Sequence, residues 1–194
     1  TIDLTPKNPF GRYDNGRPKV PDDIIERMRH VTSEEAWGVL NSNDHTLAFE
    51  GNWEIIHPHQ ILVGRAVTCR YVPSRPDLND VVEAQGKEEG RIGGQNSWAI
   101  DTLQPNDVIV VELFGKIVWG TFAGDNLATA IASNTQGGGM IVDGGMRDFQ
   151  RVVELGCGQT TLLLDALQAV RPFEVASYES DAAWAERIGD QVGH

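Results

Sequence analysis

The stretch GDNLATAIASNTQGGGMIVDGGMRD, residues 124–148, decides the fold of this chain. Within it, residues 125–134 predict a helix that begins directly after a glycine. Residues 139–145 form an apolar run beside glycines, which predicts a buried strand. The preceding residues 114–124 predict a short strand or hairpin that ends in glycines. A helix that leads through glycines into a buried strand is typical of layered α/β domains.

The same alternation extends toward the N-terminus. Residues 61–72 and 108–113 are rich in β-branched side chains and predict two further strands. Residues 74–90 predict a loop followed by a polar-faced helix, and residues 91–107 predict a loop with a Pro-Asn-Asp turn. Strand and helix therefore alternate over residues 61–148, which predicts an α/β layer with apolar strands covered by helices.

The N-terminal part predicts helices without strands. Residues 1–20 are rich in Pro, Gly and Asn and predict an arm or loop. Residues 20–30 (VPDDIIERMRH) predict a helix with acidic residues at its positive end. Thr32 and Glu35 have the spacing of a capping box, so a second helix should begin there. Residues 41–60 predict a loop with short extended pieces.

The composition limits the classes of function. The 194 residues suit one domain, or one domain with an appendage. The formal net charge of −12 speaks against sequence-independent binding of nucleic acid or anionic lipid, which needs surplus lysine and arginine. We therefore expect neither a nucleic-acid partner nor a membrane partner.

Sequence features also suggest a cellular compartment. The two cysteines, Cys69 and Cys157, have no zinc-type spacing. The first ten residues have no apolar core of the signal-peptide kind, and no apolar run approaches the ~20 residues of a membrane helix. We therefore expect a cytoplasmic protein with reduced thiols.

Residues at both ends of the opening stretch suggest an anion and metal site. The helix that follows Gly124 presents unpaired N–H groups and a positive dipole end, which bind a carboxylate or phosphate readily. Arg147 offers a planar fork for a carboxylate, and Asp148 offers a hard oxygen ligand for Mg²⁺ or Mn²⁺. Asp125 is a second carboxylate that could hold a metal-bound water. The alternatives are a plain helix cap at Gly124-Asp125-Asn126 and a solvated surface pair at Arg147-Asp148.

Several segments in order resemble the RraA-like family, over about residues 20–154. This family includes the regulator of ribonuclease activity A and the 4-hydroxy-4-methyl-2-oxoglutarate/4-carboxy-4-hydroxy-2-oxoadipate aldolases. The matching segments are EEAWGVL, ILVGRAVT, GGQNSWAIDTLQPNDVIVVEL and FGKIVWGTFAGDNLATAIASNTQGGGMIVDGGMRD. The resemblance implies a layered β/α/β core of the swivelling-domain type. It also implies a homotrimer or hexamer.

The resemblance assigns roles to individual residues. Asp148 would ligate the divalent metal, Mg²⁺ or Mn²⁺, and Arg147 would bind the carboxylate of a pyruvyl group. The backbone N–H groups of Asn126 and Leu127 would face the same carboxylate. Asp125 stands where the aldolases have an acid that holds a metal-bound water.

Two further roles concern glycine-rich positions near the cleft. Gly124 would let the substrate approach the main chain, because a glycine has no side chain in the way. Gly94 and Gln95 resemble part of a loop near the active-site cleft of the family, which makes them candidates for substrate contact.

The implied activity is that of a metal-dependent lyase. It would cleave a C–C bond of a small 2-oxo acid and release pyruvate, as a 4-hydroxy-4-methyl-2-oxoglutarate aldolase or an oxaloacetate decarboxylase does. The alternative is a non-catalytic RraA-like regulator that binds a protein. The presence of Arg147 and Asp148 favours the enzyme.

The C-terminal part has a different character. Residues 151–194 predict a βαβα appendage that resembles the start of a class I S-adenosylmethionine-dependent methyltransferase, with Gly156 and Gly158 in the turn and Glu179 for the ribose. Two strands and two helices cannot bury a core alone, so methyltransferase activity is the less favoured alternative. The predicted division is an arm over 1–20, an RraA-like domain over 21–150 and the fragment over 151–194.

Overall fold

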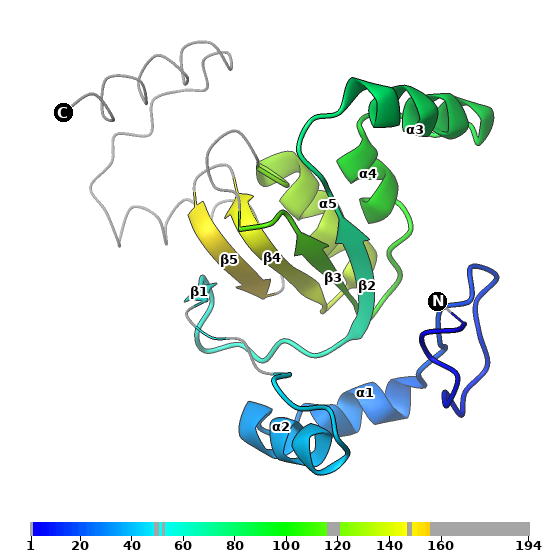
Figure 1. Ribbon diagram of the computed structural model, residues 1–194. Helices are drawn as coiled ribbons and strands as arrows, with labels where there is room; N and C mark the ends of the chain where they lie inside the picture. Colours follow the sequence, from blue (N-terminus) through cyan, green and yellow to red (C-terminus); the bar gives the residue numbers. More distant parts are fainter. Residues whose placement is uncertain (1, 49–50, 52, 116–120, 147–148, 156–194) are drawn as a thin grey trace, which may run out of the picture. The chain divides into compact units, whose positions relative to one another are not determined.

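The described residues form a five-stranded sheet with the strand order β1-β5-β4-β3-β2 (Figure 1). The structure is a computed structural model, and it describes residues 2–48, 51, 53–115, 121–146 and 149–155, the last range by its backbone alone. The strands are β1 (Glu54–Ile55), β2 (Arg65–Arg70), β3 (Asp107–Glu112), β4 (Gly139–Met146) and β5 (Phe149–Leu155). β2, β3 and β4 are parallel, whereas β5 is antiparallel to β4 and parallel to β1.

The part of the chain that the structure describes also contains five helices: α1 (Asp22–Met28), α2 (Ser33–Ser42), α3 (Pro76–Glu88), α4 (Gln95–Ile100) and α5 (Asp125–Thr135). The mixed α/β class expected from the alternating pattern is therefore present. Within the described residues, no helix is both long enough and apolar enough to cross a membrane.

The core lies between the sheet and α5, which contacts β3 and β4. Parallel register pairs Ile109 with Met140 and Val111 with Val142, so these four side chains share one face. Each is at most 1% exposed, and Ile131 of α5 is fully buried with them. Full burial of such a side chain contributes about 1.5–3 kcal/mol. The predicted buried strands and the helix between them are confirmed.

Helix α4 lies where the sequence predicts a loop. Gly93 has a φ of 79°, a conformation that glycine adopts without strain, and the next glycine begins the helix. Trp98 and Ile100 are buried, and Trp98 packs so closely on α3 that a Cβ on Gly86 would lie 2.3 Å from its ring. Tertiary contact thus stabilises a helix of six residues that local pattern does not reveal.

The two N-terminal helices form as predicted. The capping box is complete, because the Glu35 N–H donates to Thr32 Oγ1 at 3.2 Å and the Thr32 N–H donates to Glu35 Oε2 at 2.9 Å. All ten residues of α2 are described, and none of them is buried. Its helical form therefore depends on local interactions such as the cap.

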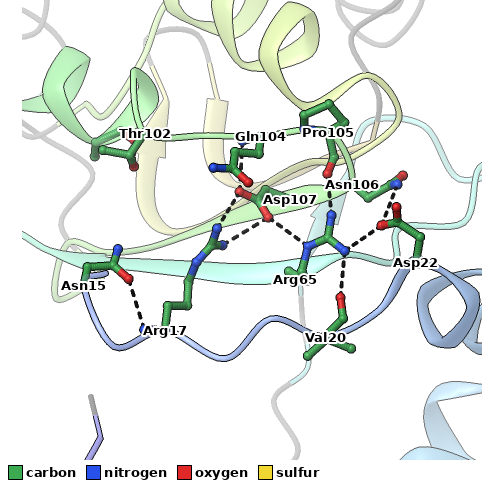
Figure 2. Close-up of polar contacts among 11 residues, drawn as sticks. Asn15, Arg17, Val20, Asp22, Arg65, Thr102, Gln104, Pro105, Asn106 and Asp107 are labelled. Carbon is green, nitrogen blue, oxygen red and sulfur yellow. Dashed lines mark hydrogen bonds and ion pairs between the residues drawn. The ribbon is translucent and has the colours of Figure 1, made fainter. Parts of the chain in front are cut away.

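The N-terminal arm is fixed to the base of the sheet by ion pairs (Figure 2). Arg17 Nη1 lies 3.0 Å from Asp107 Oδ1, and Arg17 Nη2 donates to Asp107 Oδ2 at 3.1 Å. Arg65 Nε donates to Asp107 Oδ1 at 3.4 Å, and Arg65 Nη1 donates to Asp22 Oδ1 at 2.7 Å. The hydrogen bond from Arg65 lowers the pKa of Asp22 below its ordinary value.

This arrangement adds to two predictions that the structure bears out. Residues 2–20 form an arm without helix or strand, and the ion pairs give it a defined packing role. The predicted Pro-Asn-Asp turn is present, because the Asp107 N–H donates to the Gln104 carbonyl at 3.0 Å and Asn106 has a φ of 64°. Asp107, the last residue of this turn, is also the first residue of β3 and is fully buried. A buried carboxylate requires paired charges and hydrogen bonds, and Arg17 and Arg65 supply them.

Strand β5 crosses the predicted boundary between residues 150 and 151. Its residues 152 and 153 pair with β1, and residues 152–155 pair with β4. Residues 151–155, predicted to belong to the C-terminal fragment, thus lie in the sheet. The remaining residues of that fragment, 156–194, lie outside the described residues.

Candidate functional site at the carboxyl edge of the parallel strands

The first element of the predicted site is the start of α5. Gly124 is the N-cap and is half-buried, whereas Asp125 and Asn126 are exposed. The Asn126 N–H donates to Asp125 Oδ1 at 2.8 Å, so it already has a partner in this structure. Leu127 is half-buried, and the Ala128 N–H donates to the Gly124 carbonyl at 2.9 Å. The helix start faces solvent with a carboxylate beside it.

Main-chain pairing brings this helix start to the end of β4. Thr121 forms a parallel bridge with Gly145, and the Phe122 N–H donates to the Gly145 carbonyl at 3.0 Å. Gly145 is near the end of β4, two residues before Arg147 in sequence. Ligands of open α/β sheets bind at the carboxyl ends of strands, which is the edge described here.

Arg147 and Asp148, the predicted anion-binding and metal-binding residues, lie outside the described residues. Their described neighbours are paired, because Met146 of β4 is opposite Phe149 of β5. The site roles of both residues therefore stay predictions.

A second group of side chains lies next to this helix start. The Tyr71 and Phe122 rings have centroids 5.9 Å apart, and the Tyr71 hydroxyl donates to the Gln95 carbonyl at 3.4 Å. Asn96 Nδ2 donates to the Phe122 carbonyl at 2.9 Å. Burial raises the pKa of the Tyr71 phenol, so Tyr71 stays a neutral hydrogen-bond donor. The start of α4 and the end of β2 thus contact the connection before α5.

Gly94 and Gln95, which were predicted to contact the substrate, have different surroundings at the start of α4. Gly94 is exposed and is the N-cap of α4. The Gln95 side chain turns to α3, where Nε2 donates to Asn79 Oδ1 at 2.8 Å and to Glu83 Oε1 at 3.1 Å. Sequence reasoning missed Asn96, although it is part of the same GGQNS segment.

Charged side chains also lie along the carboxyl edge. Arg70, Glu112 and Asp143 occupy one row across β2, β3 and β4. Glu112 Oε1 accepts a hydrogen bond from the Phe114 N–H at 2.5 Å, and the Arg70 guanidinium lies 5.7 Å from the centre of the Phe114 ring. This row therefore combines charges of both signs beside the turn that follows β3.

The expected divalent-metal site stays a prediction. Within the part of the chain that the structure describes, no three His, Cys, Asp or Glu residues are grouped as a metal site. Mg²⁺ requires only one or two carboxylates and keeps several waters. Asp125 offers an exposed carboxylate of the required kind, and Asp148 is the predicted ligand outside the described residues.

The parallel strands and the glycine-led helix beside their carboxyl ends define a mixed α/β protein. A family model described as RraA-like, Aldolase/RraA, matches residues 36–172. The chain belongs to this RraA-like family. The match continues past residue 150, where the RraA-like domain was predicted to end.

One solved structure resembles the chain, and it comes from the same family. It is RraAS2 of Streptomyces coelicolor, described as an unusual member of the RNase ES inhibitor RraA protein family. It is 22% identical, with a TM-score of 0.43, over 71% of this chain and 57% of that one. The chain thus spans just over half the length of that relative. No curated protein sequence matches the chain.

The resemblance of the C-terminal part to methyltransferases stays a prediction. Gly156, Gly158 and Glu179, which carry it, all lie outside the described residues.

Proposed function

We propose that this protein is a divalent-metal-dependent lyase that cleaves a C–C bond of a small 2-oxo acid and releases pyruvate. Membership in the Aldolase/RraA family supports the proposal. The observation that carries it is the hydrogen bond from the Phe122 N–H to the Gly145 carbonyl, at 3.0 Å. This bond holds the glycine-led start of α5 beside the strand that leads to Arg147 and Asp148.

Each of the proposed residues has a distinct task. The guanidinium of Arg147 binds the substrate carboxylate and stabilises the negative charge that develops on the pyruvyl fragment. The N–H of Leu127, in the first turn of α5, faces the same carboxylate. The carboxylate of Asp125 takes part in moving the proton of the C4 hydroxyl to solvent.

The electron flow needs an acceptor at the keto group. A divalent cation held by Asp148 supplies Lewis-acid chemistry there when it is bound. As the C4 hydroxyl loses its proton, the C3–C4 bond breaks and its electron pair moves toward the C2 keto oxygen. Protonation at C3 then gives pyruvate, and C4 leaves as a carbonyl compound. Oxaloacetate loses carbon dioxide by the same movement of electrons.

The proposal includes assembly into a homotrimer or hexamer. Family membership supports it, and the exposed apolar side chains of α2 give a surface that assembly could cover: Trp37, Val39 and Leu40.

The first experiment measures pyruvate release from oxaloacetate and from 4-hydroxy-4-methyl-2-oxoglutarate. Each substrate is incubated with Mg²⁺ or with EDTA, and a reaction without protein corrects for spontaneous decarboxylation. We expect release that needs both protein and metal. A folded sample that releases no pyruvate above the control would overturn the lyase and favour the protein-binding alternative.

Two variants then test the assigned residues. Asp148→Ala should abolish metal-dependent release, and Arg147→Ala should lower it on the order of 10²–10³-fold, with metal binding retained. Arg75→Ala is the matched control, because Arg75 is an exposed arginine whose Nη2 donates to Asp77 Oδ2 at 2.6 Å outside the site. Wild-type turnover in either site variant would contradict the assignment.

A further inference from the structure

The connection that leads into α5 is held from two sides. On the sheet side, the Phe122 N–H donates to the Gly145 carbonyl at 3.0 Å. On the helix side, the Phe122 carbonyl accepts a hydrogen bond from Asn96 Nδ2 at 2.9 Å. Phe122 is 2% exposed, so both bonds are shielded from water. Phe122, two residues before Gly124, therefore has both its N–H and its carbonyl held by hydrogen bonds.

Asn96 itself has little freedom to move. Its Oδ1 accepts a hydrogen bond from the Ser97 N–H at 3.1 Å, and its side chain is half-buried. It belongs to the short helix α4, which is anchored by the buried side chains of Trp98 and Ile100. The amide donor is thus aimed at the Phe122 carbonyl by a rigid element.

We infer that Asn96 is a positioning residue for the proposed active site. It sets the start of α5, with the Leu127 N–H that is assigned to the substrate carboxylate, against the end of β4. This inference rests on the proposed function. A displacement of about 1 Å between two groups that bind one substrate can lower the rate on the order of a hundredfold.

The chain offers a matched control for this bond. Asn134 Nδ2, near the other end of α5, donates to the Ile100 carbonyl at 3.1 Å. Both asparagines are half-buried. Asn96 of α4 donates to a main-chain carbonyl just before α5, and Asn134 of α5 donates to the main-chain carbonyl at the end of α4. They differ in the end of α5 that they hold, because Asn96 acts just before its start and Asn134 acts near its last residue, so a comparison of the two separates positioning from general stability.

The kinetic test compares Asn96→Ala with Asn134→Ala on oxaloacetate in the presence of Mg²⁺. We expect kcat/KM to fall on the order of ten- to a hundredfold in Asn96→Ala, mainly through a higher KM. Asn134→Ala should stay within about twofold of wild type, because its bond lies away from the substrate. Equal losses in the two variants would overturn the inference.

A second variant guards against a folding defect. Asn96→Asp keeps the shape of the side chain but replaces the Nδ2 donor by an acceptor, so it should lose activity as Asn96→Ala does. Mn²⁺ affinity should stay unchanged in both variants, because the metal ligand is not altered. Wild-type kcat/KM in Asn96→Asp would show that the donor has no positioning role.

Hydrogen exchange gives a readout that does not depend on turnover. Amides of residues 121–128 should exchange faster in Asn96→Ala than in Asn134→Ala, because the connection before α5 loses one of its two bonds. If the wild-type protein releases no pyruvate, the proposed function fails, while faster exchange still supports the positioning role. Unchanged exchange over residues 121–128 would overturn that role.

Discussion

The two edges of the same parallel strands are built in opposite ways. At the amino edge, Asp107 is fully buried between two arginines, and a Cβ on Gly138 would lie 1.7 Å from the Asp107 carbonyl oxygen. At the carboxyl edge, Asp125 and Asn126 are exposed at a helix start. One edge satisfies its charges internally, whereas the other presents polar groups to solvent.

This difference separates stability from ligand binding along the same strands. Charges that are already paired and buried have no capacity left for a ligand, and removing one of them leaves another unpaired. Exposed groups at a helix start contribute little to folding and remain available to an anion or cation. We therefore expect substitutions at the amino edge to change unfolding, and those at the carboxyl edge to change catalysis.

The largest effect is expected at the amino edge. Asp107→Ala leaves the half-buried Arg17 and Arg65 without their shared carboxylate, which should lower the free energy of unfolding by about 3–5 kcal/mol. Denaturant unfolding followed by circular dichroism would measure this. Asp22→Asn is the control, because Asp22 is exposed and should matter much less. A loss in Asp107→Ala no larger than in the control would break the comparison.

The opposite result is expected at the carboxyl edge. Asp125→Asn should lower the turnover of 4-hydroxy-4-methyl-2-oxoglutarate on the order of a hundredfold, because the variant lacks the carboxylate that moves the proton of the C4 hydroxyl. Its unfolding free energy should change by less than about 1 kcal/mol, since only a charge at the helix start is removed. Turnover and the free energy of unfolding can be measured on one preparation. A large fall in stability with unchanged turnover would show that Asp125 serves folding and not catalysis.

The reactivity of Cys69 tests whether solvent reaches the side of β2 on which its thiol lies. Burial raises the pKa of its thiol from an ordinary value of 9.0 to about 11. In a Cys157→Ser background, the lower thiolate fraction at pH 8 should slow alkylation by as much as about a hundredfold relative to the unfolded chain. Alkylation as fast as in the unfolded chain would mean that solvent reaches beneath β2.

The same shift has a consequence for alkaline stability. Because the pKa of the Cys69 thiol is raised in the folded state, the contribution of Cys69 to the free energy of unfolding is fully present below pH 9. This contribution is lost as the pH rises toward about 11. Over that interval the unfolded state releases the thiol proton before the folded state does. Stability should therefore fall more steeply in the Cys157→Ser protein than in a variant that also carries Cys69→Ser.

The parts of the fold that sequence predicted correctly depend on local pattern. β3, α5 and β4 are marked by β-branched runs, small helical residues and glycines, and each forms within about two residues of its predicted bounds. Helix α4 was missed because it is short and is stabilised by Trp98 packing against Gly86 of another helix. Such a contact leaves no periodic signal in its own segment.

The candidate site was predictable only where residue types themselves carry the chemistry. Asp125 is recognisable from the glycine-led helix start, and the structure places that start beside Gly145. Asn96 was missed because its role depends on a hydrogen bond to Phe122, 26 residues away. Arg17 was missed for the same reason, since its partner Asp107 is 90 residues away. Arg147 and Asp148 stay predictions.

The ion pair of Arg17 also bears on where a shortened version of this protein could begin. The recognisable family sequence starts at residue 36, so a fragment cut there would lack both Arg17 and Asp22. Arg65 would then be the remaining guanidinium on a fully buried carboxylate. The smallest stable fragment should therefore begin before residue 17, well upstream of the point at which the family can be recognised.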